Sequence, residues 1–329
     1  MTMATSLSSC TAQSLKIRRR ARAPLLCLNV FRRDHGPPTE LHSLVRDGNP
    51  ALVLPGVYDG LSARLATLAG HKALVVGGYS VSASSLGLPD MGLISVGELA
   101  ETGRAIVDAS LGVPVLVDGD TGGGGPGNVL RTVRDYQRRG IAGIFLEDQT
   151  FPKRCGHMQG KSCISAEEHA AKIAAARDAA GGNPFFIVAR TDAAAMHGLD
   201  EAIRRANMYA DAGASATFVE APNSIHALTR IGSETQGALR VTNFIPGGLT
   251  PALSPEELGA LGFHIVLHPL EAIFAAAHAL GCVYDSLGGN CTDGPMVQSL
   301  DFDQFNKMID APRVQREQNA YALPQIEEL

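Results

Sequence analysis

Eight short apolar runs, each followed by a stretch with helical character, dominate the chain from residue 51 onward. The runs are continuous and rich in Val, Ile and Phe, as expected of strands buried on both faces of a parallel sheet. They are Ala51–Pro55, Ala73–Gly78, Val113–Asp118, Gly143–Glu147, Phe185–Arg190, Ala216–Glu220, Leu239–Asn243 and His264–His268. Eight alternations of strand and helix predict an α/β fold, the closed (β/α)8 or TIM barrel. An open doubly wound sheet is the alternative on this pattern alone.

The stretches between the apolar runs carry helix signals of their own. Three of them match the Ser-x-x-Glu capping box, at Ser95, Ser165 and Ser254, in which the two side chains bond the first amides of a helix. Val129 and Val133 recur at the spacing of one helical face. Helices therefore alternate with the strands, as a barrel requires.

The chain has room for one barrel with extensions. It contains 329 residues, of which 45% are apolar and 19% charged, and a (β/α)8 barrel needs roughly 250. We expect a separate segment over 1–33, the catalytic barrel over 34–285 and a C-terminal extension over 286–329. Apolar residues between 302 and 309 predict a terminal helix in that extension, ending before Pro312.

Charge and cysteine content argue against several classes of protein. A formal net charge of −5 and a pI of about 6.1 are unfavourable for binding nucleic acid or anionic membranes. We find no apolar stretch of the ~18 residues that suggest a membrane span. Six cysteines without regular spacing do not indicate a disulfide framework. A reducing compartment is therefore expected.

Residues 1–33 differ in composition from the rest of the chain. They contain no Asp or Glu, and serines near the start are followed by a basic cluster over 16–22. Arg-rich, Ser-rich and acid-poor composition is typical of an organelle transit peptide. We expect import into the chloroplast, with the mitochondrion as the alternative destination and a disordered basic tail as the alternative interpretation.

Charged residues gather where the predicted strands end. The third run ends at Asp118, with Asp120 close behind, and the next three end at Glu147, Arg190 and Glu220. In barrel enzymes these ends form the active site, and clustered carboxylates repel one another unless a cation lies between them. Oxygen ligands alone suit Mg²⁺ or Mn²⁺. A set of surface salt bridges is the alternative.

Two glycine-containing segments follow the second and third strands. Gly122–Gly125 lacks the Lys-Ser/Thr of a phosphate-binding P-loop, so we interpret it as a tight turn that lets backbone pass near the metal. The segment from Gly77 to Ser80 could present backbone amides to an anionic substrate.

The loop after the fourth strand contains a cysteine between cations. Lys153 and Arg154 precede Cys155, and His157 follows it, which predicts a lowered thiol pKa and a group able to exchange a proton with carbon. The glycine between Cys155 and His157 suggests a hinge in a mobile loop. A zinc site that includes Cys163, and an ordinary exposed cysteine, are the alternatives.

Six ordered motifs resemble those of the isocitrate lyase/phosphoenolpyruvate mutase superfamily. The resemblance extends over about residues 41 to 310. The motifs are Gly-Tyr-Ser-Val-Ser-Ala with Leu-Gly-Leu-Pro-Asp (78–90), Asp-Gly-Asp-Thr-Gly (118–122), Leu-Glu-Asp-Gln (146–149), Lys-Arg-Cys-Gly-His (153–157), Ala-Arg-Thr-Asp (189–192) and Val-Glu-Ala-Pro (219–222).

The resemblance implies a role for each matching position. Asp118 would bind Mg²⁺ (or Mn²⁺) directly, and Asp90, Asp120 and Glu147 would hold its water shell. Cys155 would be the catalytic thiol on a gating loop. The resemblance also implies catalytic roles for His157, Arg190 and Glu220. The residues implied to bind substrate are Gly78, Tyr79, Ser80, Gly156, Arg190 and Asn243.

The resemblance also implies an activity and an assembly. Members with Cys-Gly-His in this loop cleave C–C bonds of small 2-oxo or 2-hydroxy dicarboxylates, such as oxaloacetate or 2-alkylmalates. 2-Methylisocitrate lyases share that loop, whereas the phosphonate mutases typically carry Asn in it. Both remain alternatives, as does a non-catalytic barrel that binds a metabolite. The family forms homotetramers in which C-terminal helices exchange between subunits, which would account for the extension.

Overall fold

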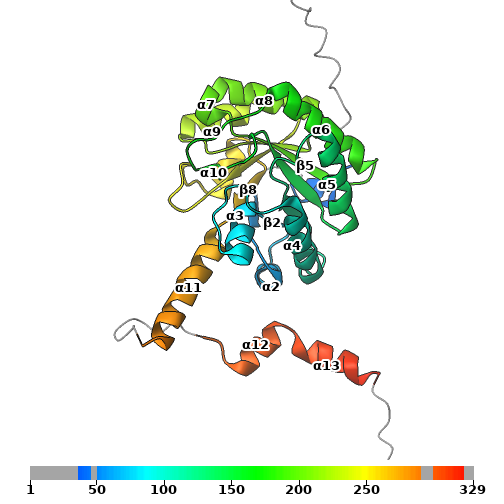
Figure 1. Ribbon diagram of the computed structural model, residues 1–329, viewed down its shortest axis with the longest axis vertical. Coiled ribbons are helices and arrows are strands. Elements are labelled where there is room, and N and C mark those ends of the chain that lie inside the picture. The colour runs from blue at the N-terminus through cyan, green and yellow to red at the C-terminus, as the bar shows by residue number, and fades with distance from the viewer. Residues whose placement is uncertain (1–35, 46–49, 290–298, 322–329) are drawn as a thin grey trace, which may run out of the picture. The chain divides into compact units, whose positions relative to one another are not determined.

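Eight parallel strands form the centre of the structure (Figure 1). This computed structural model describes residues 36–45, 50–289 and 299–321, so the predicted transit peptide lies outside the described part of the chain. The strands are β1 (Leu52–Pro55), β2 (Leu74–Val76), β3 (Val115–Asp118), β4 (Gly143–Glu147), β5 (Phe186–Thr191), β6 (Ala216–Val219), β7 (Leu239–Asn243) and β8 (Ile265–His268).

The strands close into a barrel. Each strand from β2 to β7 pairs in parallel with the next one along the chain, and β8 pairs with β1. A parallel bridge between Gly56 and Val75 joins the remaining edges of β1 and β2. The predicted (β/α)8 barrel is therefore confirmed, and the open sheet is wrong.

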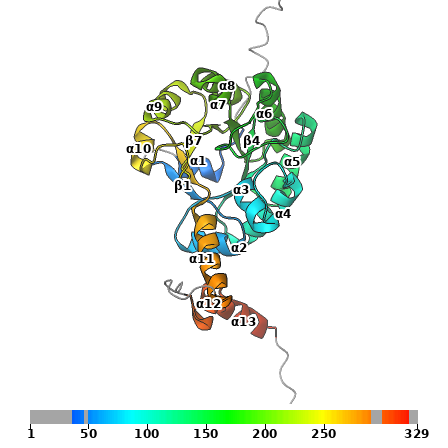
Figure 2. The same cartoon turned by 60° about the vertical axis from the view of Figure 1, so that its left-hand side comes forward.

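Helices surround the strands, as the two views in Figures 1 and 2 show. Capping boxes at Ser95 and Ser254 are formed, and the side chain of Ser165 accepts from the amide of Glu168. The helices up to the last strand are α1 (Glu40–Leu44), α2 (Gly60–Leu68), α3 (Gly78–Val81), the π-helix η2 (Ser82–Leu86), α4 (Val96–Ala109), α5 (Pro126–Arg138), α6 (Ala166–Ala180), α7 (Ala194–His197), α8 (Leu199–Asp211), α9 (Ile225–Glu234) and α10 (Pro255–Ala260).

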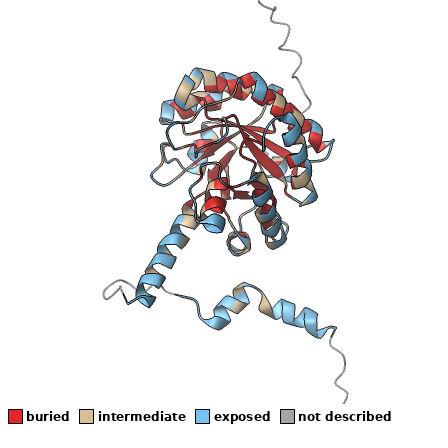
Figure 3. Cartoon of the chain, in the orientation of Figure 1, coloured by how far each residue is buried: buried red, intermediate tan, exposed pale blue. Residues whose placement is uncertain are grey.

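Burial follows the layers of the barrel (Figure 3). Every residue of β2, β4 and β6 is buried, because side chains of a barrel strand pack alternately against the interior and the surrounding helices. Leu116, Phe145 and Phe186 belong to one buried cluster, while Val129 and Tyr136 of α5 belong to another. The apolar runs predicted from the sequence are thus the core strands.

The predicted strand bounds agree with the structure to within two residues. β4 and β7 have the predicted bounds. The second strand ends two residues early, at Val76, because Gly78 begins the one-turn helix α3. This early end places the backbone of Gly78 at the mouth of the barrel rather than in the sheet.

The segment after β8 consists of helices with little burial. None of the residues of α11 (Glu271–Leu287) is buried. The predicted helix that ends before Pro312 is present as α12 (Phe302–Met308), and a second helix that was not predicted, α13 (Ala311–Asn319), follows it. Pro312 occupies the first turn of α13, where its missing amide hydrogen has no helical partner to lose. No helix in the described ranges has the length and apolarity to cross a membrane.

Candidate active site

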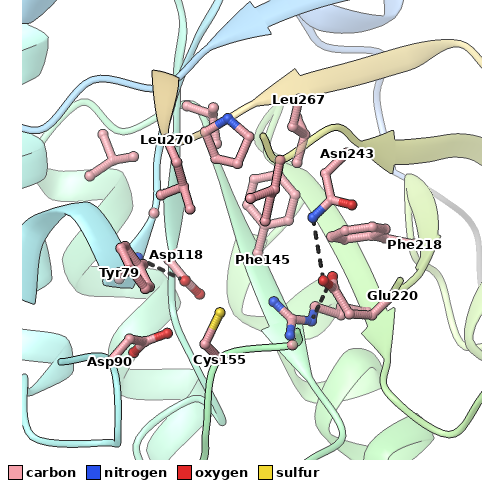
Figure 4. A pocket seen from close by; sticks show the side chains of 18 residues that line it. Tyr79, Asp90, Asp118, Phe145, Cys155, Phe218, Glu220, Asn243, Leu267 and Leu270 are labelled. Carbon is pink, nitrogen blue, oxygen red and sulfur yellow. Dashed lines mark hydrogen bonds and ion pairs between the residues drawn. The ribbon is translucent and has the colours of Figure 1, made fainter. Parts of the chain in front are cut away.

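A small cavity lies at the carboxyl ends of the barrel strands (Figure 4). Its volume of about 80 Å³ suits a small organic acid. The sulfur of Cys155 points into it, between Asp118 and Glu220. Most of the predicted site residues therefore meet around one space: Gly78, Tyr79, Asp90, Asp118, Cys155, Gly156, Arg190, Glu220 and Asn243 line the cavity.

Asp118 is held in place by backbone donors. The amide of Gly78 donates to Oδ2 of Asp118 at 2.9 Å, and the amide of Asp120 donates to Oδ1 at 2.9 Å. The hydroxyl of Tyr136 donates to the carbonyl of Asp118 at 2.6 Å. A Cβ on Gly78 would lie 3.2 Å from the carboxylates of both Asp118 and Asp120, so glycine allows the tight approach.

Lys153 is buried between two of the predicted metal-site carboxylates. Its Nζ lies 2.6 Å from Oδ1 of Asp90 and 2.7 Å from Oδ1 of Asp120. Burial, together with the charge of Asp118, nevertheless raises the pKa of Asp120 to about 7. One ammonium therefore does not neutralise the cluster, which still favours additional positive charge.

Glu147 adds a fourth carboxylate to this side of the site. It is buried, and its Oε1 has no hydrogen-bond partner among the described residues. Burial raises its pKa well above the ordinary value. Within the described ranges, no three His, Cys, Asp or Glu side chains are arranged to hold a metal ion directly. The arrangement is compatible with one direct carboxylate ligand and others that act through water.

Arg190 lies between Glu147 and two further carboxylates, and its Nη2 is 3.5 Å from Oε2 of Glu147. Its Nε is 2.9 Å from Oδ2 of Asp192 and 3.4 Å from Oε2 of Glu220. Burial alone would raise the pKa of Glu220, but the positive charge of Arg190 lowers it below the usual range. Nδ2 of Asn243 donates to Oε1 of Glu220 at 3.3 Å, and Nε2 of His157 lies 3.2 Å from the same oxygen.

The predicted lowered pKa of Cys155 is wrong. Burial raises the pKa of the thiol, the amide of His157 lowers it in part, and the charge of Glu220 raises it further. Lys153 turns away toward its carboxylate partners, and Arg154 is exposed. The adjacent cations in the sequence therefore do not set the state of this thiol, which stays protonated at neutral pH.

The backbone segments around the thiol lie close to the charged groups. A Cβ on Gly156 would lie 2.4 Å from Oε1 of Glu220 and 2.5 Å from a guanidinium nitrogen of Arg190, so glycine is required there by packing, whether or not it acts as a hinge. Tyr79 lies in the first turn of α3, whose amides have no partner inside the helix. The hydroxyl of Ser80 turns away and donates to the carbonyl of Gly77.

Two other interpretations of the sequence change with the structure. Gly122–Gly125 forms the expected turn, but a Cβ on Gly122 would meet Val129 of α5 at 2.5 Å. The segment packs against helices and does not line the cavity. Sγ of Cys163 donates to Asp148 at 3.2 Å, which leaves no support for zinc bound by Cys155, His157 and Cys163.

Sequence reasoning missed two groups of site residues. The first is an apolar wall, formed by Phe145, Phe218, Ile245, Leu267, Pro269 and Leu270; in the sequence these residues look like ordinary core. The second is the pair of buried lysines, Lys153 and Lys161, whose ammonium groups turn inward from an exposed loop. The signal for them in the sequence is that the two lysines flank Cys155, one on each side.

The comparison with known families agrees with this site. A family model described as phosphoenolpyruvate phosphomutase matches residues 41–287. The chain belongs to the phosphoenolpyruvate mutase/isocitrate lyase superfamily. It is therefore an enzyme of a superfamily of lyases, mutases and hydrolases.

Two curated plant proteins resemble most of the chain. The petal death protein of Dianthus caryophyllus is 49% identical over 275 residues, which cover 83% of this chain and 86% of the relative. The carboxyvinyl-carboxyphosphonate phosphorylmutase, chloroplastic, of Arabidopsis thaliana is 47% identical over 276 residues, which cover 83% and 81%. The resemblance thus covers the whole barrel.

Solved structures resemble the chain over a similar extent. Oxaloacetate acetylhydrolase in complex with 3,3-difluorooxalacetate superposes with a TM-score of 0.80 and 30% identity, over 87% of this chain and 97% of that one. A phosphonopyruvate hydrolase complex with oxalate and Mg²⁺ has a TM-score of 0.73 and 25% identity, over 86% and 99%.

The environment of Cys155 predicts a specific titration. The thiolate is the form that alkylates, and a raised pKa lowers its fraction at any given pH. The rate of Cys155 alkylation should therefore rise with pH at a midpoint above that of the synthetic peptide Pro152–His157, which has the same cations without the burial. Mass spectrometry of the alkylated peptides measures both profiles. A midpoint in the protein below that of the peptide would contradict the structure.

Proposed function

We propose that this enzyme cleaves a C–C bond in a small 2-oxo or 2-hydroxy dicarboxylate, with Cys155 as the proton donor. One observation carries the proposal: a protonated thiol shares a small cavity with the carboxylate of Asp118 and with the half-buried guanidinium of Arg190, which is paired with Glu220. An acid at this position can protonate a carbanion that leaves the substrate. Structural relatives include an oxaloacetate acetylhydrolase and a 2,3-dimethylmalate lyase.

Two reactions fit these groups. Water adds at C2 of oxaloacetate, and cleavage of the C2–C3 bond gives oxalate and acetate. A 2-alkylmalate has its hydroxyl already at C2, so the same cleavage gives a 2-oxo acid and acetate. In both, the C2 hydroxyl loses its proton as its oxygen becomes a carbonyl or carboxylate oxygen, and the electron pair of the broken bond leaves on the acetate fragment. Cys155 supplies the proton that completes the methyl group, and the proton released from the hydroxyl balances the one that restores the thiol.

The carboxylate side of the cavity fits Mg²⁺, with Mn²⁺ as the substitute. Asp118 would bind the ion directly, and Asp90, Asp120 and Glu147 would hold its water. The unpartnered Oε1 of Glu147 and the raised pKa of Asp120 support an unmet need for positive charge. When bound, such an ion polarises the oxygen at C2 of the substrate.

The remaining residues bind and orient the substrate. Arg190 is a half-buried cation that lines the cavity and would pair with a substrate carboxylate. The backbone segment of Gly78, Tyr79 and Ser80 would bind the carboxylate next to C2 through the amides of Tyr79 and Ser80, while the amide of Gly78 holds Asp118. Glu220 holds Arg190, and Asn243 and His157 hold Glu220 in turn and complete the pocket. Gly156 keeps the thiol segment close to these groups.

We further infer that the enzyme assembles as a homotetramer with exchanged C-terminal helices. Leu280, Tyr284 and Leu287 of α11 are 51%, 65% and 79% exposed, and a helix with this much exposed apolar surface needs a partner. Light scattering coupled to gel filtration measures the assembly; a monomer would contradict it. The apolar residues of α12 and α13 would be buried in the same contact.

We also propose that residues 1–33 direct import into the chloroplast. The acid-free, basic composition of the segment supports this, as does the chloroplastic relative. N-terminal sequencing of the protein from native tissue should find a start near residue 34. An intact N-terminus on the mature protein would contradict it.

The role of Cys155 predicts a selective kinetic loss. Because serine is a far weaker acid than a thiol, Cys155→Ser should lower kcat for oxaloacetate or a 2-alkylmalate by about 10²–10⁴-fold. Oxalate resembles the half of the substrate that stays at the metal, so its Kd should be unchanged. Cys282→Ser, on α11 and not part of the cavity lining, is the control and should retain full activity. Near-normal cleavage by Cys155→Ser would overturn the role of the thiol.

The carboxylate cluster predicts a metal requirement. Dialysis against EDTA should abolish turnover, and added Mg²⁺ should restore it. Mg²⁺ should also raise the Tm of the wild-type protein through preferential binding to the folded state. Asp118→Asn should lose both responses, whereas Asp303→Asn, at an exposed position of α12, should keep them. Full activity in chelator would disprove the metal assignment.

A further inference from the structure

Lys161 is a buried cation in an otherwise exposed part of the thiol loop. Its side chain is 4% exposed, while Met158, Gln159, Gly160 and Ser162 are all exposed. Burial of an ammonium group costs free energy unless the charge is paired and its protons are hydrogen-bonded. The loop has therefore turned this side chain inward for a specific set of contacts.

The contacts of Lys161 join two parts of the active site. Its Nζ donates to Oδ1 of Asp192 at 2.7 Å and also to the carbonyl of Gly156. Gly156 is the residue directly after Cys155 and lines the cavity. One ammonium group thus connects the peptide next to the thiol with a carboxylate at the end of β5.

Asp192 is the same carboxylate that orients Arg190. Its Oδ2 accepts from Nε of Arg190 at 2.9 Å, and its Oδ1 accepts from a second guanidinium nitrogen at 3.1 Å. The backbone amide of Asp192 donates to Asp148 at 2.9 Å, so the carboxylate sits on a fixed base. Asp192 therefore forms ion pairs with two cations, Arg190 in the barrel and Lys161 in the loop.

The segment Cys155–Gly156, which Lys161 contacts, is packed so tightly that a small shift would change its contacts with the site. A Cβ on Gly156 would already lie 2.4 Å from Oε1 of Glu220. The other end of the thiol segment is held by the amide of Cys155, which donates to the carbonyl of Asp90 at 3.2 Å. If the Lys161 contact were lost, the carbonyl of Gly156 would lack its ammonium donor, and the ring of His157, 3.2 Å from Oε1 of Glu220, would be the nearest remaining anchor on that side of the thiol.

We propose that Lys161 is a positioning residue that fixes the thiol of Cys155 relative to the guanidinium of Arg190, through Gly156 and Asp192. The proposal rests on the proposed function, because it assigns the thiol and the guanidinium to one substrate. Lys161 would thus act differently from Lys153, the other buried lysine of the loop, which pairs with Asp90 and Asp120.

The test compares Lys161→Met with Gln159→Met, which places the same side chain at an exposed position of the same loop. In Lys161→Met, alkylation of Cys155 by iodoacetamide should become on the order of tenfold faster, because an unsatisfied buried group opens the loop. Misplacement of the thiol should lower kcat by about a hundredfold, with a smaller effect on KM. Lys161→Arg keeps the charge and donors and should recover much of the protection and the turnover. Gln159→Met should behave as wild type.

The alkylation measurement separates this proposal from the proposed function. If the wild-type enzyme cleaves neither substrate but Lys161→Met still exposes Cys155, the contact between loop and barrel stands and the assigned reaction fails. If Lys161→Met shows wild-type alkylation and wild-type kcat, Lys161 does not position the thiol. Faster alkylation with unchanged kcat would overturn the proposal as well. Should Lys161→Met fail to fold, Lys161→Gln is subject to the same outcomes.

Discussion

The burial of like charges at one end of the barrel is the constraint on which the site depends. Asp90, Asp120 and Glu147 are buried beside Asp118; the ammonium group of Lys153 pairs with the first two, and the guanidinium of Arg190 lies 3.5 Å from Glu147. Carboxylates in such a place must be paired, protonated or bound to an ion. The backbone amides of Gly78 and Asp120 stabilise the charge of Asp118. The amide of Gly78 is available for this because β2 ends at Val76. The parallel barrel supplies the geometry, because all its strands end on the same face.

The same burial decides what the thiol can do. Cations beside a cysteine in the sequence usually indicate a reactive thiolate. Here the ammonium groups of Lys153 and Lys161 pair with carboxylates, and Cys155 shares the cavity with Glu220, whose charge adds to the effect of burial on the thiol. A thiol that keeps its proton is poorly suited to nucleophilic attack and well suited to donate that proton. The charge balance of the loop therefore favours acid catalysis.

Much of the fold followed from the sequence, because buried parallel strands leave continuous apolar runs and helices leave capping boxes. The charged strand ends could be predicted for the same reason: Asp118, Glu147 and Arg190 each stand at the end of such a run. The direction of side chains in loops could not be predicted from the sequence. The spacing of Lys153 and Cys155 gives no sign that the thiol is buried, which raises its pKa, or that the lysine turns toward Asp90.

The products formed from a 2-alkylmalate in D₂O test the account most directly. With Mg²⁺ and 2-methylmalate, NMR should show pyruvate and acetate in equal amounts, and the acetate methyl group should carry one deuteron, delivered to the carbanion as the C–C bond breaks. Phosphonopyruvate should not be rearranged. Consumption of phosphonopyruvate without cleavage of 2-methylmalate or oxaloacetate would contradict the account, since the site would then act on a C–P bond and the thiol of Cys155 would have no carbanion to protonate.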